Sequence, residues 1–201
     1  MEENQIKSKV ITSLIWKLLE RGGTQGIQFI VQVILARLLL PEDYGIIALI
    51  SIFILLANVF VQSGFNTALI QKKEADEIDF SSVFYLSLFI SSILYVLLYI
   101  TAPYLAIFFD EPGLTQVLRV VSFTLFFGAF NSIQIAYVSK KMMFKKMFFS
   151  SLGAVCISGF LGILSAYLGL GVWALVVQQL TSQFTICVIL WFIVKWRPSL
   201  T

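Results

Sequence analysis

Residues 147–194 read MFFSSLGAVCISGFLGILSAYLGLGVWALVVQQLTSQFTICVILWFIV and include no charged side chain. A helix needs about 20 predominantly apolar residues to cross a hydrocarbon core that is about 30 Å thick. This stretch is long enough for two crossings, and Gly169-Leu170-Gly171 is the turn-forming sequence near its middle. The stretch therefore predicts two membrane-spanning helices that form a tight antiparallel hairpin.

Four more segments of the chain have the length and apolar character of a membrane span. The six predicted spans are residues 13–40, 45–69, 80–99, 114–139, 147–168 and 172–194. They are rich in Leu, Ile and Phe and lack the sustained alternation that is typical of membrane strands. Only 12% of the residues are charged, against about 25% in a typical soluble domain, so the composition excludes a water-soluble globule. We predict an all-α integral membrane protein with one six-transmembrane-helix bundle.

Several classes of function are excluded by what the sequence lacks. The chain has no histidine, so it has no histidine base, no Ser-His-Asp triad and no histidine metal ligand. Cys156 and Cys187 lie inside apolar runs, and we interpret them as small core residues instead of a disulfide or redox pair. The sequence contains no G-x-x-x-x-G-K-[ST] loop, so we expect no ATP hydrolysis and coupling to an ion or proton gradient instead. We predict no enzymatic activity, no catalytic residue, no metal site and no cofactor.

The distribution of basic residues predicts the orientation of the chain. Ten of the 14 Lys and Arg residues lie in the terminal segments and loops on one side of the predicted bundle, and the loops on the other side contain none. Basic residues of short loops stay in the cytoplasm, so we expect both termini there. For the same reason we interpret the net charge of +3 as a topology signal and expect no nucleic-acid partner. The N-terminus mixes acidic and basic residues, which is not the pattern of a cleavable signal peptide.

The segment YLAIFF, residues 104–109, follows Pro103 and is too short to cross a membrane by itself. It is also too apolar for open solvent. Two readings remain: an interfacial segment that lies along the outer leaflet, or an extension of the third span. We favour the interfacial segment.

A stripe of polar side chains follows one face of the first span. Its members are spaced three or four residues apart: Lys17, Glu20, Arg21, Thr24, Gln25, Gln28 and Gln32. Lipid cannot form hydrogen bonds with amides, so the stripe faces other helices or a water-filled cavity, and we favour the cavity. Arg21 lies near the cytoplasmic boundary, where it either extends to water or presents its guanidinium to a phosphate.

Weaker polar stripes occur on most of the other spans. On the second span the stripe includes Asn58 and Gln62, and on the fourth it includes Asn131 and Gln134. The last span carries Gln178, Gln179, Ser182 and Gln183, which we assign to hydrogen bonds between helices. The candidate cavity residues are Arg21, Gln25, Gln28, Gln32, Asn58, Gln62, Asn131 and Gln134.

Small residues mark one face of the fifth span. The pattern Ser158-x-x-x-Gly162-x-x-x-Ala166 brings three of them onto one ridge. Small residues at this spacing let neighbouring helices approach closely, so the pattern predicts a packing interface within the bundle.

Four segments, in this order and spacing, resemble the amino-terminal half of bacterial polysaccharide-export flippases. They are LLLPEDYGIIAL (38–49), GFNTALIQKKEAD (64–76), APYLAIFFDEPGLTQVLRVVS (102–122) and QIAYVSKKMMFKKM (134–147). These flippases, of the lipopolysaccharide, colanic-acid and teichuronic-acid type, belong to the multidrug/oligosaccharidyl-lipid/polysaccharide exporter superfamily. One departure is Leu40, where the family often has Gly before the Pro-x-Asp-Tyr-Gly turn.

The resemblance implies that the bundle is one lobe of a two-lobed exporter in the bacterial inner membrane. Family members place two six-helix lobes around a central cavity and move a polyprenyl-pyrophosphate-linked oligosaccharide between leaflets by alternating access. The implied partners are therefore lipid-linked oligosaccharide, membrane lipids and a second six-helix lobe, which is absent from this chain and is supplied in cis or by oligomerisation. Basic cavity residues are thought to hold the pyrophosphate, and Arg21 is the one candidate that we carry over.

Three other functions fit parts of the sequence. A drug or cation exporter on the same scaffold would need a buried acidic residue, and Glu20, at the boundary, is the nearest candidate. An intramembrane glycosyl or phosphoryl transferase would need an acidic pair, for which the 74–79 cluster is the only source. A lone six-helix lobe could also serve as a scaffold without transport.

Overall fold

The computed structural model describes residues 2–62, 69, 77–141, 143–194 and 197–198, and for residues 2–11, 13, 62 and 77 it describes the backbone alone. Every regular element in this part of the chain is a helix. The helices are α1 (Glu2–Leu38), α2 (Pro41–Gln62), α4 (Glu77–Phe108), α5 (Leu114–Val121), α6 (Thr124–Lys140), α7 (Phe144–Tyr167) and α8 (Val172–Ile193). The all-α prediction is confirmed.

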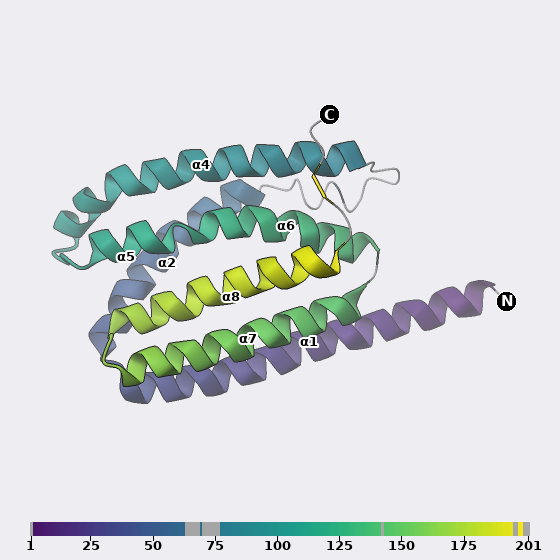
Figure 1. Cartoon of the computed structure of the whole chain (residues 1–201), viewed down its shortest axis with the longest axis horizontal. Coiled ribbons are helices and arrows are strands. Elements are labelled where there is room, and N and C mark those ends of the chain that lie inside the picture. The colour runs from purple at the N-terminus through teal and green to yellow at the C-terminus, as the bar shows by residue number, and fades with distance from the viewer. Residues whose placement is uncertain (1, 63–68, 70–76, 142, 195–196, 199–201) are drawn as a thin grey trace.

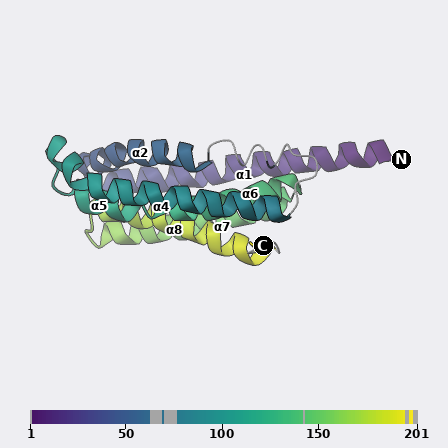
Figure 2. The same cartoon turned by 90° about the horizontal axis from the view of Figure 1, so that it is seen from above.

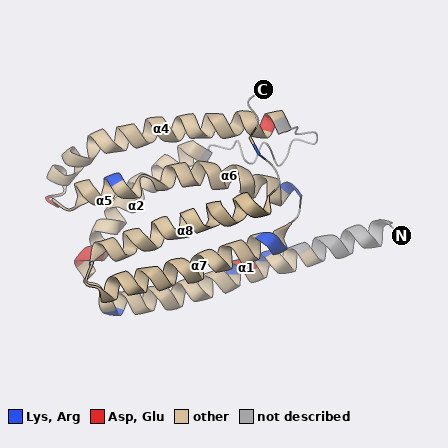
Figure 3. Cartoon of the chain, in the orientation of Figure 1, with Lys and Arg blue, Asp and Glu red and all other residues tan. Residues whose placement is uncertain are grey.

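The helices run along the long axis of the molecule. Across the front, α4, α5 with α6, α8 and α7 follow one another, and α1 and α2 lie behind them (Figures 1 and 2). Both ends of the chain lie at the same end of the bundle, which is the result expected for an even number of crossings (Figure 1). The charged residues gather near the two ends, and the ribbon between them is almost free of charge (Figure 3).

Five segments are long and apolar enough to cross a membrane. They are Pro41–Val61, Ile78–Phe108, Leu114–Lys140, Phe144–Tyr167 and Val172–Ile193. Large apolar side chains on their outer faces, such as Phe89, Phe160 and Phe192, are more than 60% exposed, as in a protein whose solvent is lipid. The prediction of an integral membrane bundle is confirmed for these five spans.

The first predicted span is not among the five, because its polar stripe lowers its hydropathy. However, α1 packs along α7 in the same direction. The Oγ of Ser151 donates a hydrogen bond to Glu20 Oε1 over 3.1 Å. About three turns further along α1, Val31 lies so close to Gly159 of α7 that a Cβ on this glycine would be 2.6 Å from Val31 Cγ2. Since α7 is itself long enough to cross a membrane, α1 extends over the same thickness.

The interpretation of residues 104–109 as a separate interfacial segment is wrong. Helix α4 continues through Pro103 to Phe108. Proline removes the N–H group that would bond to the carbonyl of Tyr99, four residues earlier. Here the Nε of Arg119 donates to that carbonyl over 3.3 Å, and its guanidinium lies 4.1 Å from the centre of the Tyr99 ring. A side chain from α5 thus replaces the missing bond, and the helix runs on.

The fourth predicted span is two helices, α5 and α6, separated by Ser122 and Phe123. The hydroxyl of Ser122 donates to the carbonyl of Leu118 over 2.6 Å, and that of Thr124 to the carbonyl of Val121 over 2.7 Å. Hydroxyl groups that bond back in this way compete with the backbone ladder and bend helices. The last two predicted spans agree with α7 and α8 to within three residues, whereas α1 begins at Glu2, eleven residues before the predicted start of the first span. The part of the second span beyond Gln62 lies outside the described residues.

The predicted tight hairpin between the last two spans is confirmed. Gly169 and Gly171 have φ angles of 75° and 53°, a region that suits glycine. Farther along, a Cβ on Gly162 would lie 2.9 Å from Gln178 Cβ, so the small residue lets α7 and α8 meet closely. Ser158, Gly162 and Ala166 are all buried, and the predicted packing ridge is therefore present.

The turn between α1 and α2 forms without glycine at position 40. Pro41 begins α2, where its missing N–H costs nothing, and the carboxylate of Asp43 accepts a 3.1 Å hydrogen bond from the N–H of Leu40. Asp110 is the one described residue other than glycine with a positive φ, so Leu40 needs no left-handed conformation. The departure from the family pattern at Leu40 therefore leaves the turn intact.

Candidate functional site

Two adjoining pockets open between the helices of the bundle. The first, of about 560 Å³, lies between α2, α6 and α8, and the second, of about 360 Å³, lies between α1, α2, α7 and α8. Ser51, Gln179 and Gln183 line both pockets. We call the two pockets together the polar groove. Its hydrogen-bonding residues are Gln28, Gln32, Tyr44, Ser51, Asn58, Asn131, Ser132, Ser158, Gln178, Gln179, Ser182 and Gln183.

The groove lies between α1 and α2, which diverge from a shared end like the two arms of a V (Figure 1). Helices α1 and α2 meet at one end, where Leu39 packs in the same cluster as Tyr44 and Ile47. From there α2 crosses behind α8 and α6 toward α4, while α1 stays beside α7 (Figure 1). The arms of the V supply the groove walls, and α8 with α6 supplies its floor. The V opens toward the end of the bundle where the two chain termini lie.

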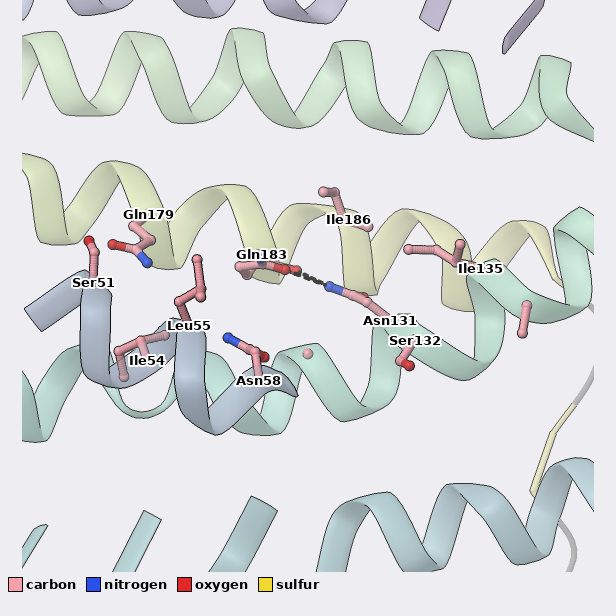
Figure 4. A pocket seen from close by; sticks show the side chains of 12 residues that line it. Ser51, Ile54, Leu55, Asn58, Asn131, Ser132, Ile135, Gln179, Gln183 and Ile186 are labelled. Atoms are coloured by element: carbon pink, nitrogen blue, oxygen red, sulfur yellow. Dashed lines mark hydrogen bonds between the residues drawn. The ribbon is translucent and has the colours of Figure 1, made fainter. Parts of the chain in front are cut away.

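An amide pair joins α6 to α8 on the floor of the groove. Asn131 Nδ2 donates to Gln183 Oε1 over 3.0 Å and to the Gln183 carbonyl over 3.1 Å (Figure 4). Its own Oδ1 is buried and has no hydrogen-bond partner. Asn58 reaches into the same pocket from α2, and a Cβ on Gly128 would lie 3.0 Å from Asn58 Oδ1. Glycine at position 128 therefore makes room for this second amide.

A second amide pair joins α1 to α8. Gln32 Nε2 donates to Gln178 Oε1 over 3.5 Å, a long and weak bond. The Nε2 of Gln178 is buried without a partner, and so is the hydroxyl of Tyr44. Five buried side-chain atoms in the described part of the chain lack a partner, and three of them belong to residues of the polar groove. Buried polar groups are normally paired, and these three atoms are enclosed within the helix contacts that border the groove.

The structure brings four of the eight candidate residues to the groove: Gln28, Gln32, Asn58 and Asn131. Arg21 and Gln25 are exposed on α1 and line neither pocket. Gln134 is 1% exposed and packs inside the bundle, where its Oε1 has no partner. The side chain of Gln62 lies outside the described residues.

The α8 residues are not among the candidates that the sequence predicts. Gln178, Gln179, Ser182 and Gln183 all line the groove. The sequence predicts bonds between helices for them, and Gln178 and Gln183 do make such bonds. The density of amides was the available signal: three glutamines within six residues are more than helix packing needs.

The described residues that line the groove include no charged side chain. Glu20 is 9% exposed but lies between α1 and α7, where it accepts the bond from Ser151. No group of three or more Cys, Asp or Glu residues that could hold a metal ion occurs in the described part of the chain. The arrangement is therefore suited to hydrogen bonding with a neutral polar solute.

Comparison with known proteins gives a family match over most of the chain. Residues 34–201 match the model of a family described as polysaccharide biosynthesis protein. The chain is 27% identical over 199 residues to the succinoglycan biosynthesis transport protein ExoT of Rhizobium meliloti (strain 1021), covering 96% of this chain and 39% of the relative. It is 28% identical over 152 residues to the teichuronic acid biosynthesis protein TuaB of Bacillus subtilis (strain 168), covering 71% of this chain and 30% of the relative.

The chain spans about two fifths or less of the length of these curated relatives. No solved structure matches it.

Proposed function

Because the chain belongs to the polysaccharide biosynthesis protein family, we propose that it is one lobe of a flippase for lipid-linked oligosaccharide. The substrate would be an oligosaccharide on polyprenyl pyrophosphate, moved from the inner to the outer leaflet of the bacterial inner membrane. The family match and the apolar helices support the broader part of this proposal, a multi-pass membrane protein of polysaccharide transport.

The observation that supports the proposal most strongly is the polar groove. A sugar chain that entered bare hydrocarbon would lose many hydroxyl hydrogen bonds, and each unsatisfied polar group costs several kcal/mol there, on the order of 2–7. The groove offers amides and hydroxyls from α1, α2, α6 and α8 at the depth of the membrane spans. A saccharide can exchange its water for these groups, while the lipid tail stays in the bilayer.

A second lobe is part of the proposal. Gln28 and Gln32 of the polar stripe line the groove, but Arg21 and Gln25 of the same stripe are exposed and line neither pocket. Lipid cannot satisfy these groups, so a facing lobe, in the same polypeptide or from another copy, would close the path. We expect that the 201-residue chain alone, as a monomer, moves no lipid-linked sugar.

The proposed orientation has both termini in the cytoplasm. Lys140, Lys141, Lys145 and Lys146 lie at the same end of the bundle as the termini. Positive residues in such short loops favour the cytoplasmic side. A cysteine at Lys141, in a variant whose Cys156 and Cys187 are alanines, should resist an impermeant thiol reagent in intact cells. Labelling from outside would overturn the orientation.

The alternative of a drug or cation exporter has less support. Binding a cation in low dielectric needs a facing negative charge, and the described groove residues provide none. A transferase would need an acidic cluster in the membrane surface region. The candidate acidic cluster is residues 74–79, and residues 74 and 76 of it lie outside the described part of the chain.

Deletion of the gene in its own bacterium tests the proposed function. Loss of a flippase should stop surface polysaccharide and let full-length oligosaccharide on polyprenyl pyrophosphate accumulate at the cytoplasmic leaflet. Loss of a glycosyl transferase would instead leave shortened intermediates, and loss of a drug exporter would leave the polysaccharide normal. Either of these two results would overturn the proposal.

A further inference from the structure

Aromatic rings and lysines interlock where the start of α7 packs against α1. The ring centre of Trp16 on α1 lies 5.6 Å from that of Phe148 on α7. Lys145 of α7 reaches back to α1, and its Nζ lies 5.6 Å from the centre of the Trp16 ring. In the opposite direction, the Nζ of Lys17 on α1 lies 5.3 Å from the centre of the Phe144 ring. We call these five residues the lysine-aromatic cluster.

The cluster has an excess of positive charge. Lys17 and Lys145 are exposed, and neither has an acidic partner among the described residues. Lys146 and Arg21, also exposed, follow them within one turn of the same helices. The carboxylate of Glu20 is buried and accepts a bond from α7, and the first turn of α7 contains no acidic residue. Positive charges gathered in one place repel one another, and a bound anion would remove that repulsion.

The cluster lies at one boundary of the membrane-spanning region. The apolar span of α7 begins at Phe144, within the cluster itself. The basic residues near this point give way to an almost uncharged ribbon along α7 (Figure 3). Leu18 and Phe149, which follow the cluster residues on the two helices, are 72% and 53% exposed. A glycerophospholipid has the same division, because its phosphate lies at the boundary and its acyl chains lie in the apolar core.

We propose that the lysine-aromatic cluster binds the phosphate of one anionic glycerophospholipid of the bilayer. Basic side chains between membrane helices are the groups that hold such headgroups. Lys17 and Lys145 supply the charge from two helices, and the rings beneath them hold both ammonium groups in place. No residue of the cluster lines the polar groove, so this site is separate from the saccharide path and does not depend on the proposed function.

Native mass spectrometry of the full chain in detergent at pH 7 tests the inference with two soluble lipids. Dioctanoyl phosphatidylglycerol carries one negative charge, whereas dioctanoyl phosphatidylcholine has the same acyl chains and no net charge. We expect phosphatidylglycerol to saturate a single site and to bind at least about fivefold more tightly than phosphatidylcholine. Equal affinities for the two lipids would overturn the inference.

Variants connect the binding to the cluster. Lys17→Gln and Lys145→Gln should each weaken phosphatidylglycerol binding by about fivefold, the contribution of one basic side chain near an anionic headgroup. Lys145→Arg keeps the positive charge and should bind normally. Lys141→Gln is the matched control, because it removes one charge at the same end of the bundle from a separate contact with the Tyr137 ring of α6. Equal weakening by Lys141→Gln would show that net charge alone attracts the lipid, and the inference would be wrong.

Geranylgeranyl pyrophosphate distinguishes a phospholipid site from a site for the headgroup of the proposed substrate. If Lys17→Gln and Lys145→Gln weaken binding of this pyrophosphate and leave phosphatidylglycerol binding unchanged, the inference is wrong. The proposed function stands in that case, since the groove and the gene-deletion test are independent of the cluster. Weaker phosphatidylglycerol binding by both variants, with normal binding by Lys145→Arg and Lys141→Gln, supports the phospholipid site.

Discussion

Polar groups at the junction of α4 and α5 have partners, whereas several polar groups in the groove have none. At the junction, Pro103 frees the carbonyl of Tyr99 and Arg119 donates to it. Nearby hydroxyls bond back to the helix carbonyls, as Thr101 does to Leu97 over 2.8 Å. In the groove, Asn131 Oδ1, Gln178 Nε2 and the hydroxyl of Tyr44 are buried and unpaired.

At the junction the fold supplies partners for polar groups within the apolar spans. Gln134 Oε1 and Ser150 Oγ are also buried and unpaired, so the groove amides are distinguished by lining a pocket and not by lacking partners alone. The side chains line the groove, and their bonds to neighbouring helices keep them oriented. The comparison predicts that changes at the junction act on stability and that changes in the groove act on transport.

The largest effect is expected from a charge on the lipid side of α8. Phe184 is 53% exposed and lines an apolar pocket with Phe123, Phe127, Leu180 and Thr181, on the side of α8 away from the groove. Phe184→Lys places an ammonium in lipid and should destabilise the inserted protein by about 2.5–3.5 kcal/mol. Gln179→Lys, less than two turns away but facing the groove, should destabilise it much less. Equal losses of folded protein in denaturation assays would remove the distinction between the two faces.

The second-largest effect on stability is expected at the junction of α4 and α5. Arg119→Leu leaves the carbonyl of Tyr99 without a donor and should lower the free energy of unfolding by about 1 kcal/mol. Pro103→Ala restores the backbone N–H, so the double variant should recover most of that loss. Melting temperatures of the four proteins measure the coupling. Additive effects would show that Arg119 does not compensate for the proline.

A smaller effect is expected from the amide pair between α1 and α8. Gln32→Leu removes the bond to Gln178 and should cost about 0.6 kcal/mol, the average for a polar contact between membrane helices. Gln28 lines the same pocket and has no hydrogen-bond partner among the described contacts, so Gln28→Leu should change stability less. A larger loss for Gln28→Leu than for Gln32→Leu would contradict the assigned contacts.

The smallest effect on stability is expected at Arg21, which is exposed on α1. Arg21→Gln should change the free energy of unfolding by less than about 0.5 kcal/mol, as for most exposed positions. If its guanidinium meets the pyrophosphate, export should nevertheless fall at limiting substrate, because Gln keeps hydrogen bonding and loses the charge. Unchanged export would leave Arg21 as a residue that extends to water.

The sequence was sufficient to predict the spans because long apolar runs and turn residues act locally. It was insufficient at Pro103, where the replacement donor, Arg119, lies 16 residues away in the next helix. The break at Ser122 depends on hydroxyl bonds that composition alone does not specify. These are tertiary effects that override a local signal.

The candidate site was predicted in part for a similar reason. Helical spacing placed Gln28 and Gln32 on one face, and both line the groove. Spacing within one helix does not determine which other helix it faces, so the role of α8 in both pockets was not predicted. Gln134 shares the spacing of Asn131 but is buried within the bundle, since one helical face can border a groove and a packing interface at once.

Export by the double variant Gln28→Leu/Gln32→Leu tests the groove most directly. Cells that carry the variant are compared with cells that carry Thr181→Val, an isosteric change on the opposite side of α8, at matched amounts of inserted protein. If the groove carries saccharide, export of surface polysaccharide should fall by about tenfold or more, the equivalent of roughly 1.4 kcal/mol, while Thr181→Val exports normally. Normal export by the double variant, with only a lowered melting temperature, would contradict the saccharide path and leave the stripe of α1 as a packing feature.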